Sequence, residues 1–230
     1  MRQYFPFTDY DFYAYLTSGF FVIVGADYAF TSGTNTLLHD WVIFESVLLV
    51  TTAYITGQVF ASFSSVVLEH ILARRVFSPP LSILMGAPPS WHERMLSRLL
   101  GRGYTALHKT SREQICQRAA RQLHKSTEEI EADPSAVFSP AYQAARSNDD
   151  CRGRVDGFRN QYGFARNLAF VGLTVATMLL CNGLWATDGG LIVIYIASMV
   201  MLVRFFKFYA AFMDEVLRYY AFGEGNDDAN

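Results

Sequence analysis

A stretch of 23 residues without a charged side chain, Ser46 to Leu68, limits the possible folds of this chain more than any other feature. About 20 apolar residues in a helix are enough to cross the hydrocarbon core of a bilayer, which is about 30 Å thick. Backbone groups in lipid must be hydrogen-bonded within their own segment, so the stretch is predicted to be a transmembrane helix. Trp41 precedes it and Arg74 and Arg75 follow it, as is typical of the two membrane interfaces.

Four spans are predicted in all, at about 10–30, 41–72, 163–187 and 190–222. The first could instead be a secretory signal peptide, but two aspartates outweigh its single arginine and no clear cleavage site follows, so a retained span is preferred. The second and fourth are longer than a bilayer is thick, and helices 2 and 4 are therefore predicted to extend into the cytosol.

The fold class expected from this pattern is an all-α integral membrane protein with two transmembrane hairpins. The predicted parts are an N-terminal hairpin at 1–76, a cytosolic helical insert at 77–158, a C-terminal hairpin at 159–222 and an acidic disordered tail at 223–230. The insert contains too few apolar residues for a large core of its own. We expect it to pack on the helix extensions, on a second copy or on another protein.

Within the insert, short helices are expected between polar loops. Ser90 is predicted to cap one of them, and the Thr-x-x-Glu pattern of Thr110 and Glu113 predicts a capping box at the start of another. The polar run 147–153, SNDDCRG, is predicted to be a loop before the third span.

The distribution of positive charge predicts the orientation. All 19 Lys and Arg residues fall within residues 1–11, 73–166 and 204–230, and none lies in the two hairpin turns. Because short loops rich in Lys and Arg remain on the cytoplasmic side, both termini and the insert are predicted to be cytoplasmic, with the protein integral to the cell membrane.

Two acidic residues, Asp27 and Glu45, lie a few residues inside the predicted outer ends of the first two spans. Ionisable groups within a membrane are costly and often functional. If the two carboxylates face each other, a proton or a cation could bridge them. The alternative interpretation is that both simply reach the water of the headgroup region.

Four basic residues are expected at the level of the inner leaflet: Arg159, Arg166, Arg204 and Lys207. The first two are seven residues apart and share a helix face. One interpretation is a binding site for a lipid headgroup, a nucleotide or a protein partner. The other is anchoring at the membrane together with ion pairs between helices. The carboxylates available for such pairs are those of Asp9, Asp11, Glu69 and Asp214.

The second span is unusually polar and carries small residues at regular spacing. Ala53, Gly57 and Ala61 are four residues apart, a pattern that lets helices approach closely in lipid. Gln58 lies near the middle of the span, where an unpaired amide is costly. It is predicted to face another helix or a water-filled pore.

The sequence contains no recognisable catalytic motif, and we expect no enzyme, no metal site and no cofactor. The three cysteines and five histidines are spread widely, which favours neither a disulfide framework nor a metal cluster. The net charge of −2 predicts no nucleic-acid partner.

These features favour a non-enzymatic, oligomeric membrane component that couples a cytosolic event or partner to the membrane. It would act as a sensor or scaffold, or as a channel-like, ion-permeable assembly. Its partners would be membrane lipids, further copies of itself and a cytosolic protein bound through the insert. The alternative is a membrane enzyme that acts on phosphate-bearing headgroups at the inner leaflet, with Arg166 and Arg204 binding phosphate.

Overall fold

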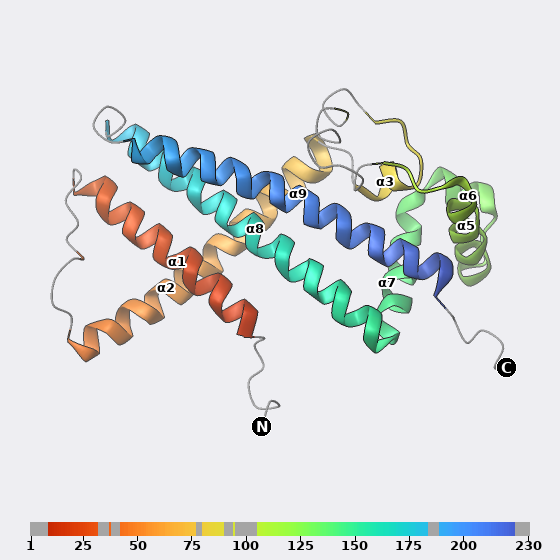
Figure 1. Ribbon diagram of the computed structural model, residues 1–230, viewed down its shortest axis with the longest axis horizontal. Coiled ribbons are helices and arrows are strands. Elements are labelled where there is room, and N and C mark those ends of the chain that lie inside the picture. Colours follow the sequence, from red (N-terminus) through yellow and green to blue (C-terminus); the bar gives the residue numbers. More distant parts are fainter. Residues whose placement is uncertain are drawn as a thin grey trace. The chain divides into compact units, whose positions relative to one another are not determined.

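The computed structural model describes residues 9–31, 37, 42–76, 80–89, 94, 105–183 and 189–223, with only the backbone at 9–11 and 74–76. Every regular element in these residues is a helix (Figure 1). The chain divides into two compact units. The span unit comprises Met1–Leu72 with Gly163–Phe205, and the insert unit comprises Ala73–Tyr162 with Phe206–Asn230.

The span unit contains the whole of α1 (Asp9–Phe30) and α2 (Ile43–Ser64). It also contains the first part of the π-helical continuation of α2 (Ser65–Val76), the last part of α8 (Asp149–Cys181) and the first part of α9 (Gly190–Phe222). Three of the described helices are long and apolar enough to cross a membrane: Ile43–Ala73, α8 and α9. The helix α1 is not among them, because its aspartates and tyrosines lower its hydropathy. Three membrane-compatible helices are therefore established, and the four-span arrangement stays a prediction.

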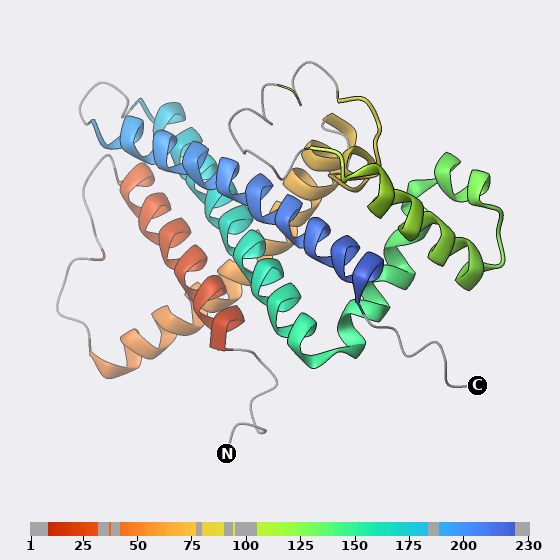
Figure 2. The ribbon, with the colours of Figure 1, turned by 45° about the vertical axis from the view of Figure 1, so that its right-hand side comes forward.

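The helices α1 and α2 pack closely because glycine lies at their contact (Figure 2). A Cβ atom on Gly19 would collide with the carbonyl group of Ala53, and one on Gly57 would collide with the carbonyl of Tyr15. The small-residue face of α2, including Ala61, is buried. The predicted close-packing face therefore contacts α1 of the same chain.

The helix α1 also packs on α8, through an apolar cluster. Val22 and Ala29 of α1 and Val175 of α8 are buried in it, and Phe60 of α2 packs against it. Gly25 of α1 lies so close to Val175 that a Cβ atom there would come within 2.6 Å of both its methyl groups. Small residues again decide how closely the helices approach.

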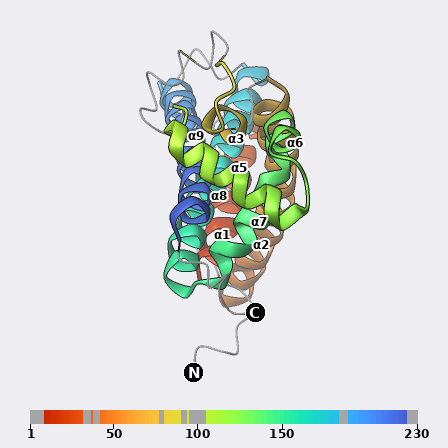
Figure 3. The same cartoon turned by 90° about the vertical axis from the view of Figure 1, so that its right-hand side faces the viewer.

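The insert unit contains short helices (Figure 3): α3 (Pro80–Leu84), α5 (Lys109–Leu123), α6 (Thr127–Ala132), a 3-10 turn (Pro134–Val137) and α7 (Phe138–Ser147). Two of them, α5 and α7, contact the C-terminal half of α9. Phe138 and Tyr142 of α7 contact the ring of Phe212 at centroid distances of 6.3 and 6.1 Å. Tyr162 of α8 contacts Tyr209 and Phe212. The insert therefore contacts the extension of α9, one of the three surfaces expected for it, and its dependence on that contact stays a prediction.

A polar contact joins α5 to the end of α9. Arg118 donates from Nη1 to the carbonyl oxygens of Tyr220 and Gly223, at 2.8 and 3.3 Å, and its guanidinium lies over the Tyr220 ring. The Tyr220 hydroxyl donates to Gln122 at 2.9 Å. The carbonyl groups that end α9 thus receive a cationic donor, as the helix dipole favours.

Two local predictions in the insert are wrong. The helix α5 begins at Lys109, with His108 as its N-cap and no side-chain capping bond, so Thr110 lies inside the helix. The run 147–153 is not a loop, because α8 begins at Asp149. Asn148 Oδ1 accepts the backbone N–H of Cys151 at 3.0 Å, and two aspartates in the first turn complement the helix dipole.

The helix predicted from Ser90 lies almost wholly outside the described residues. A capping box does occur in the insert, but at Ser126 and Glu129, where each side chain accepts the other residue's backbone N–H.

Candidate functional site

A buried polar cluster in the span unit joins α2 and its continuation to α8. The hydrogen-bonding pattern of the second helix changes after Ser64 from α-helical to π-helical. A π-helical turn holds an extra residue and therefore shifts the face on which later side chains lie, and such turns are frequent at functional sites. Glu69 lies in this segment.

Glu69 forms an ion pair with Arg166 of α8. Arg166 Nη1 lies 2.7 Å from Glu69 Oε2, and the two side chains are only 14% and 15% exposed. The hydroxyl of Ser65 lies 3.3 Å from the same carboxylate oxygen. A charge-assisted hydrogen bond of this length is strong, and burial makes each charge depend on the other.

Asn167 and Ser64 complete the cluster. Asn167 Oδ1 lies 2.7 Å from the Ser64 hydroxyl oxygen and accepts from Arg166 Nη2 at 3.3 Å. Both Asn167 and Ser64 are buried. Hydrogen bonds join these five side chains, so the cluster can hold two helices in register.

The sequence named Arg166 as a basic site residue, and the structure gives it a carboxylate partner. This outcome agrees with the alternative interpretation, in which Lys and Arg near the span ends form ion pairs between helices. The signal in the sequence was an arginine and a glutamate at matching depth in two spans. Ser64, which proved to be the contact of Asn167, carried no signal beyond being one of many serines in its span.

The other three basic residues are all exposed. Arg204 belongs to the span unit, whereas Arg159 and Lys207 belong to the insert unit. Arg166 is the basic residue whose carboxylate contact the structure defines, and a shared basic site for the four residues stays a prediction.

The acidic residues Asp27 and Glu45 both accept backbone hydrogen bonds close to the ends of their helices. Asp27 Oδ2 accepts the N–H of Leu37 at 3.4 Å, and Glu45 Oε2 accepts the N–H of Val42 at 3.2 Å. The contact of Glu45 caps the start of α2, where a carboxylate also complements the helix dipole. Each carboxylate therefore has a local structural role, and their joint role as a proton or cation site stays a prediction.

Gln58 is exposed on α2, at the middle of the candidate span Ile43–Ala73. The hydroxyls of Thr51 and Ser62 donate to carbonyl oxygens of their own helix, of Val47 and Gln58, at 2.8 and 3.0 Å. Within the described part of the chain, the Gln58 side-chain amide has no hydrogen-bond partner. The polar face predicted around Gln58 is therefore distinct from the buried small-residue face.

No group of three His, Cys, Asp or Glu residues suited to a metal ion occurs in the described residues. Cys116 of α5 is buried, and burial raises the pKa of its thiol, with Glu131 adding to the effect. A protonated, buried thiol is a poor nucleophile.

No family model, curated protein or solved structure matches the chain.

Proposed function

We propose that this protein is a non-enzymatic membrane component that assembles with further copies of itself and couples a cytosolic event or partner to the membrane. The observation that carries the proposal is the exposed amide of Gln58 at the middle of a candidate span. An amide in hydrocarbon without a hydrogen-bond partner costs roughly 2 kcal/mol or more. Lipid tails offer no partner.

A second copy offers the partner that lipid lacks. Glutamine has both a donor and an acceptor, so two copies related by a twofold axis can pair Gln58 with Gln58. The neighbouring hydroxyls of Thr51 and Ser62 are satisfied within α2, so they add polar surface without needing a partner. The same face could alternatively line a water-filled path between copies, which would make the assembly ion-permeable.

The insert unit would receive the cytosolic signal. In this proposal both termini and the insert are cytoplasmic, because the hairpin turns contain no Lys or Arg. The helices α8 and α9 each contribute residues to both units without a break, so an event at the insert has a continuous helical route to the spans. The exposed polar side chains of α5 and α6 would give a soluble partner a surface to bind.

The ion pair of Arg166 supports this proposal over a headgroup-processing enzyme. In the enzyme hypothesis Arg166 binds phosphate, but its guanidinium already contacts the carboxylate of Glu69 at 2.7 Å. Binding phosphate there would leave a buried carboxylate without its partner, which is costly.

The substitution Gln58→Leu tests the proposal, with Ser62→Ala as the matched control on the same face. Copies bearing donor or acceptor fluorophores are reconstituted together in phosphatidylcholine vesicles, and energy transfer is measured against the protein-to-lipid ratio. Gln58→Leu should weaken association about threefold, since membrane hydrogen bonds between helices average about 0.6 kcal/mol. Ser62→Ala should leave it unchanged, because its hydroxyl bonds only its own helix. Equal energy transfer for Gln58→Leu and wild type would contradict the proposal.

A further inference from the structure

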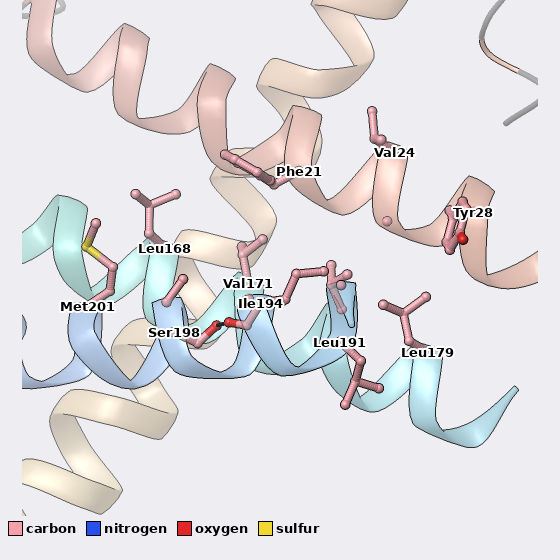
Figure 4. Close-up of a pocket in the computed structure, with 15 residues that line it drawn as sticks. Phe21, Val24, Tyr28, Leu168, Val171, Leu179, Leu191, Ile194, Ser198 and Met201 are labelled. Atoms are coloured by element: carbon pink, nitrogen blue, oxygen red, sulfur yellow. Dashed lines mark hydrogen bonds between the residues drawn. The ribbon is translucent and has the colours of Figure 1, made fainter. Parts of the chain in front are cut away.

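A groove in the span unit is lined by one face each of α1, α8 and α9 (Figure 4). Its volume is about 630 Å³, which lies in the range of small-molecule sites. Of its lining residues on α1, Phe21 is 60% exposed and Val24 is 47% exposed. Figure 4 shows side chains of α1 on one side of the groove and those of α8 and α9 on the other.

The groove is almost wholly apolar. Among its lining residues only Tyr28 and Ser198 have polar side chains. The Ser198 hydroxyl already donates to the carbonyl oxygen of Ile194 at 2.6 Å. An apolar cavity disfavours water, which needs two to four polar partners. The occupant must therefore be apolar along most of its length.

The length of the groove corresponds to one leaflet. It extends along α8 from Leu168 to Leu179 and along α9 from Gly190 to Met201. Each stretch covers a rise of about 17 Å at 1.5 Å per residue. This is close to half of the hydrocarbon core of about 30 Å. One acyl chain of a lipid, entering from the leaflet at the level of Gly190, matches both the length and the chemistry.

The charged residues near the Gly190 end of the groove favour one class of lipid headgroup over another. No Lys or Arg occurs in residues 3–73 or 167–203, so no cation from these parts of the chain meets a headgroup there. Asp27 is next to Tyr28, which lines the groove. A net anionic headgroup would find no counter-charge in these segments, whereas the amine of a zwitterionic headgroup suits an acidic neighbour.

We propose that the groove between α1, α8 and α9 binds one acyl chain of a zwitterionic phospholipid, with the headgroup at the level of Tyr28 and Gly190. Bilayer lipid reaches the groove from the side through the exposed wall formed by Phe21 and Val24. This site is separate from the Gln58 face of α2 and does not depend on self-assembly.

The test uses the full-length protein in detergent micelles and a phosphatidylethanolamine with a diazirine on one acyl chain. After illumination, adducts are mapped by peptide mass spectrometry as the probe concentration rises. Labelling within Leu168–Leu179 and Gly190–Met201 should saturate at one lipid per chain and be displaced by unlabelled phosphatidylethanolamine. A phosphatidylglycerol probe should label these peptides more weakly at the same concentration.

Two neighbouring substitutions on α9 separate the groove from general lipid contact. Ala197 lines the groove, and Ala197→Phe should fill it and weaken saturable labelling about tenfold, since overfilling an apolar site is costly. Ile196 is also exposed but lies outside the groove lining, so Ile196→Phe should leave labelling unchanged. Circular dichroism should show that both variants are folded.

Labelling that rises linearly without saturation, or that is equal in the two variants, would overturn the proposal. Stronger saturable labelling by phosphatidylglycerol or by a diazirine fatty acid would also overturn it, because the headgroup assignment would then be wrong.

Discussion

Each unit of the molecule contains an ion pair between helices, but the two pairs differ in burial. In the span unit, Glu69 and Arg166 are 15% and 14% exposed and lie 2.7 Å apart. In the insert unit, Arg154 and Glu215 are 62% and 21% exposed and lie 3.2 Å apart, so the arginine of this pair is at the surface. A buried pair leaves a costly charge behind when one partner is removed, whereas a surface pair contributes little. We therefore expect the pair in the span unit to contribute more to stability than the pair in the insert unit.

The apolar contacts of the two units differ in a similar way. The span unit is held by close backbone approach at glycine, as between Gly57 and Tyr15, while large apolar side chains such as Ile43 and Phe44 face outward. The insert unit buries large rings such as Phe206 and Tyr220, whereas in the span unit the buried ring of Phe205 lies next to the unit boundary in the sequence. Lipid removes the hydrophobic reason to bury large side chains between spans, whereas a unit in water depends on burying them.

The largest effect on folding is expected when the insert is separated from α9. Residues 78–158 expressed alone should show no cooperative thermal transition by circular dichroism, because Phe212 and Tyr220 of α9 are missing from the core. Residues 78–162 joined to 206–223 by a flexible linker are the control and should melt cooperatively. A cooperative melt of the shorter segment would mean that the insert has a sufficient core of its own.

Breaking each of the two ion pairs should lower the free energy of unfolding by a different amount. Glu69→Leu should lower the free energy of unfolding by about 3–5 kcal/mol, because it leaves Arg166 buried without its partner. Arg154→Leu should change it by about 0–1 kcal/mol. Unfolding in mixed micelles by sodium dodecyl sulfate measures both.

The double variant Glu69→Leu with Arg166→Leu is the control for the buried pair. It should recover most of the stability lost in Glu69→Leu, since neither charge is then left alone. Equal losses for Glu69→Leu and Arg154→Leu would show that burial does not distinguish the two pairs.

A smaller effect is expected from adding one methyl group at a helix contact. Gly57→Ala places a Cβ against the carbonyl of Tyr15 and should lower the free energy of unfolding by about 1–3 kcal/mol. Gly163→Ala is the matched control, because nothing lies within 4 Å of its new Cβ, and it should raise stability by about 0.5–1 kcal/mol. The same detergent titration measures both, and a gain in stability for Gly57→Ala would argue against the close approach of α1 and α2.

Much of the candidate site could be named from the sequence, but not its pairing. Arg166 and Glu69 were both identified as charged residues near the inner ends of spans. Their pairing depends on the π-helical segment after Ser64, which changes the face on which Glu69 lies, and no residue pattern in the sequence indicates it. The groove was missed for a similar reason. Its lining residues are ordinary apolar residues of three helices, and only the packing of those helices leaves a space between them.

The sequence by itself determined the helical class, the membrane-compatible helices and the polarity of the insert. These follow from local composition and from the requirement that backbone groups in lipid bond within their own segment. Only the tertiary structure decided which face of α2 meets α1, with the small residues inward and Gln58 outward. Both faces satisfy the helical period equally well, so the choice between them depends on the shape of α1, where Gly19 allows the backbone of α2 to approach.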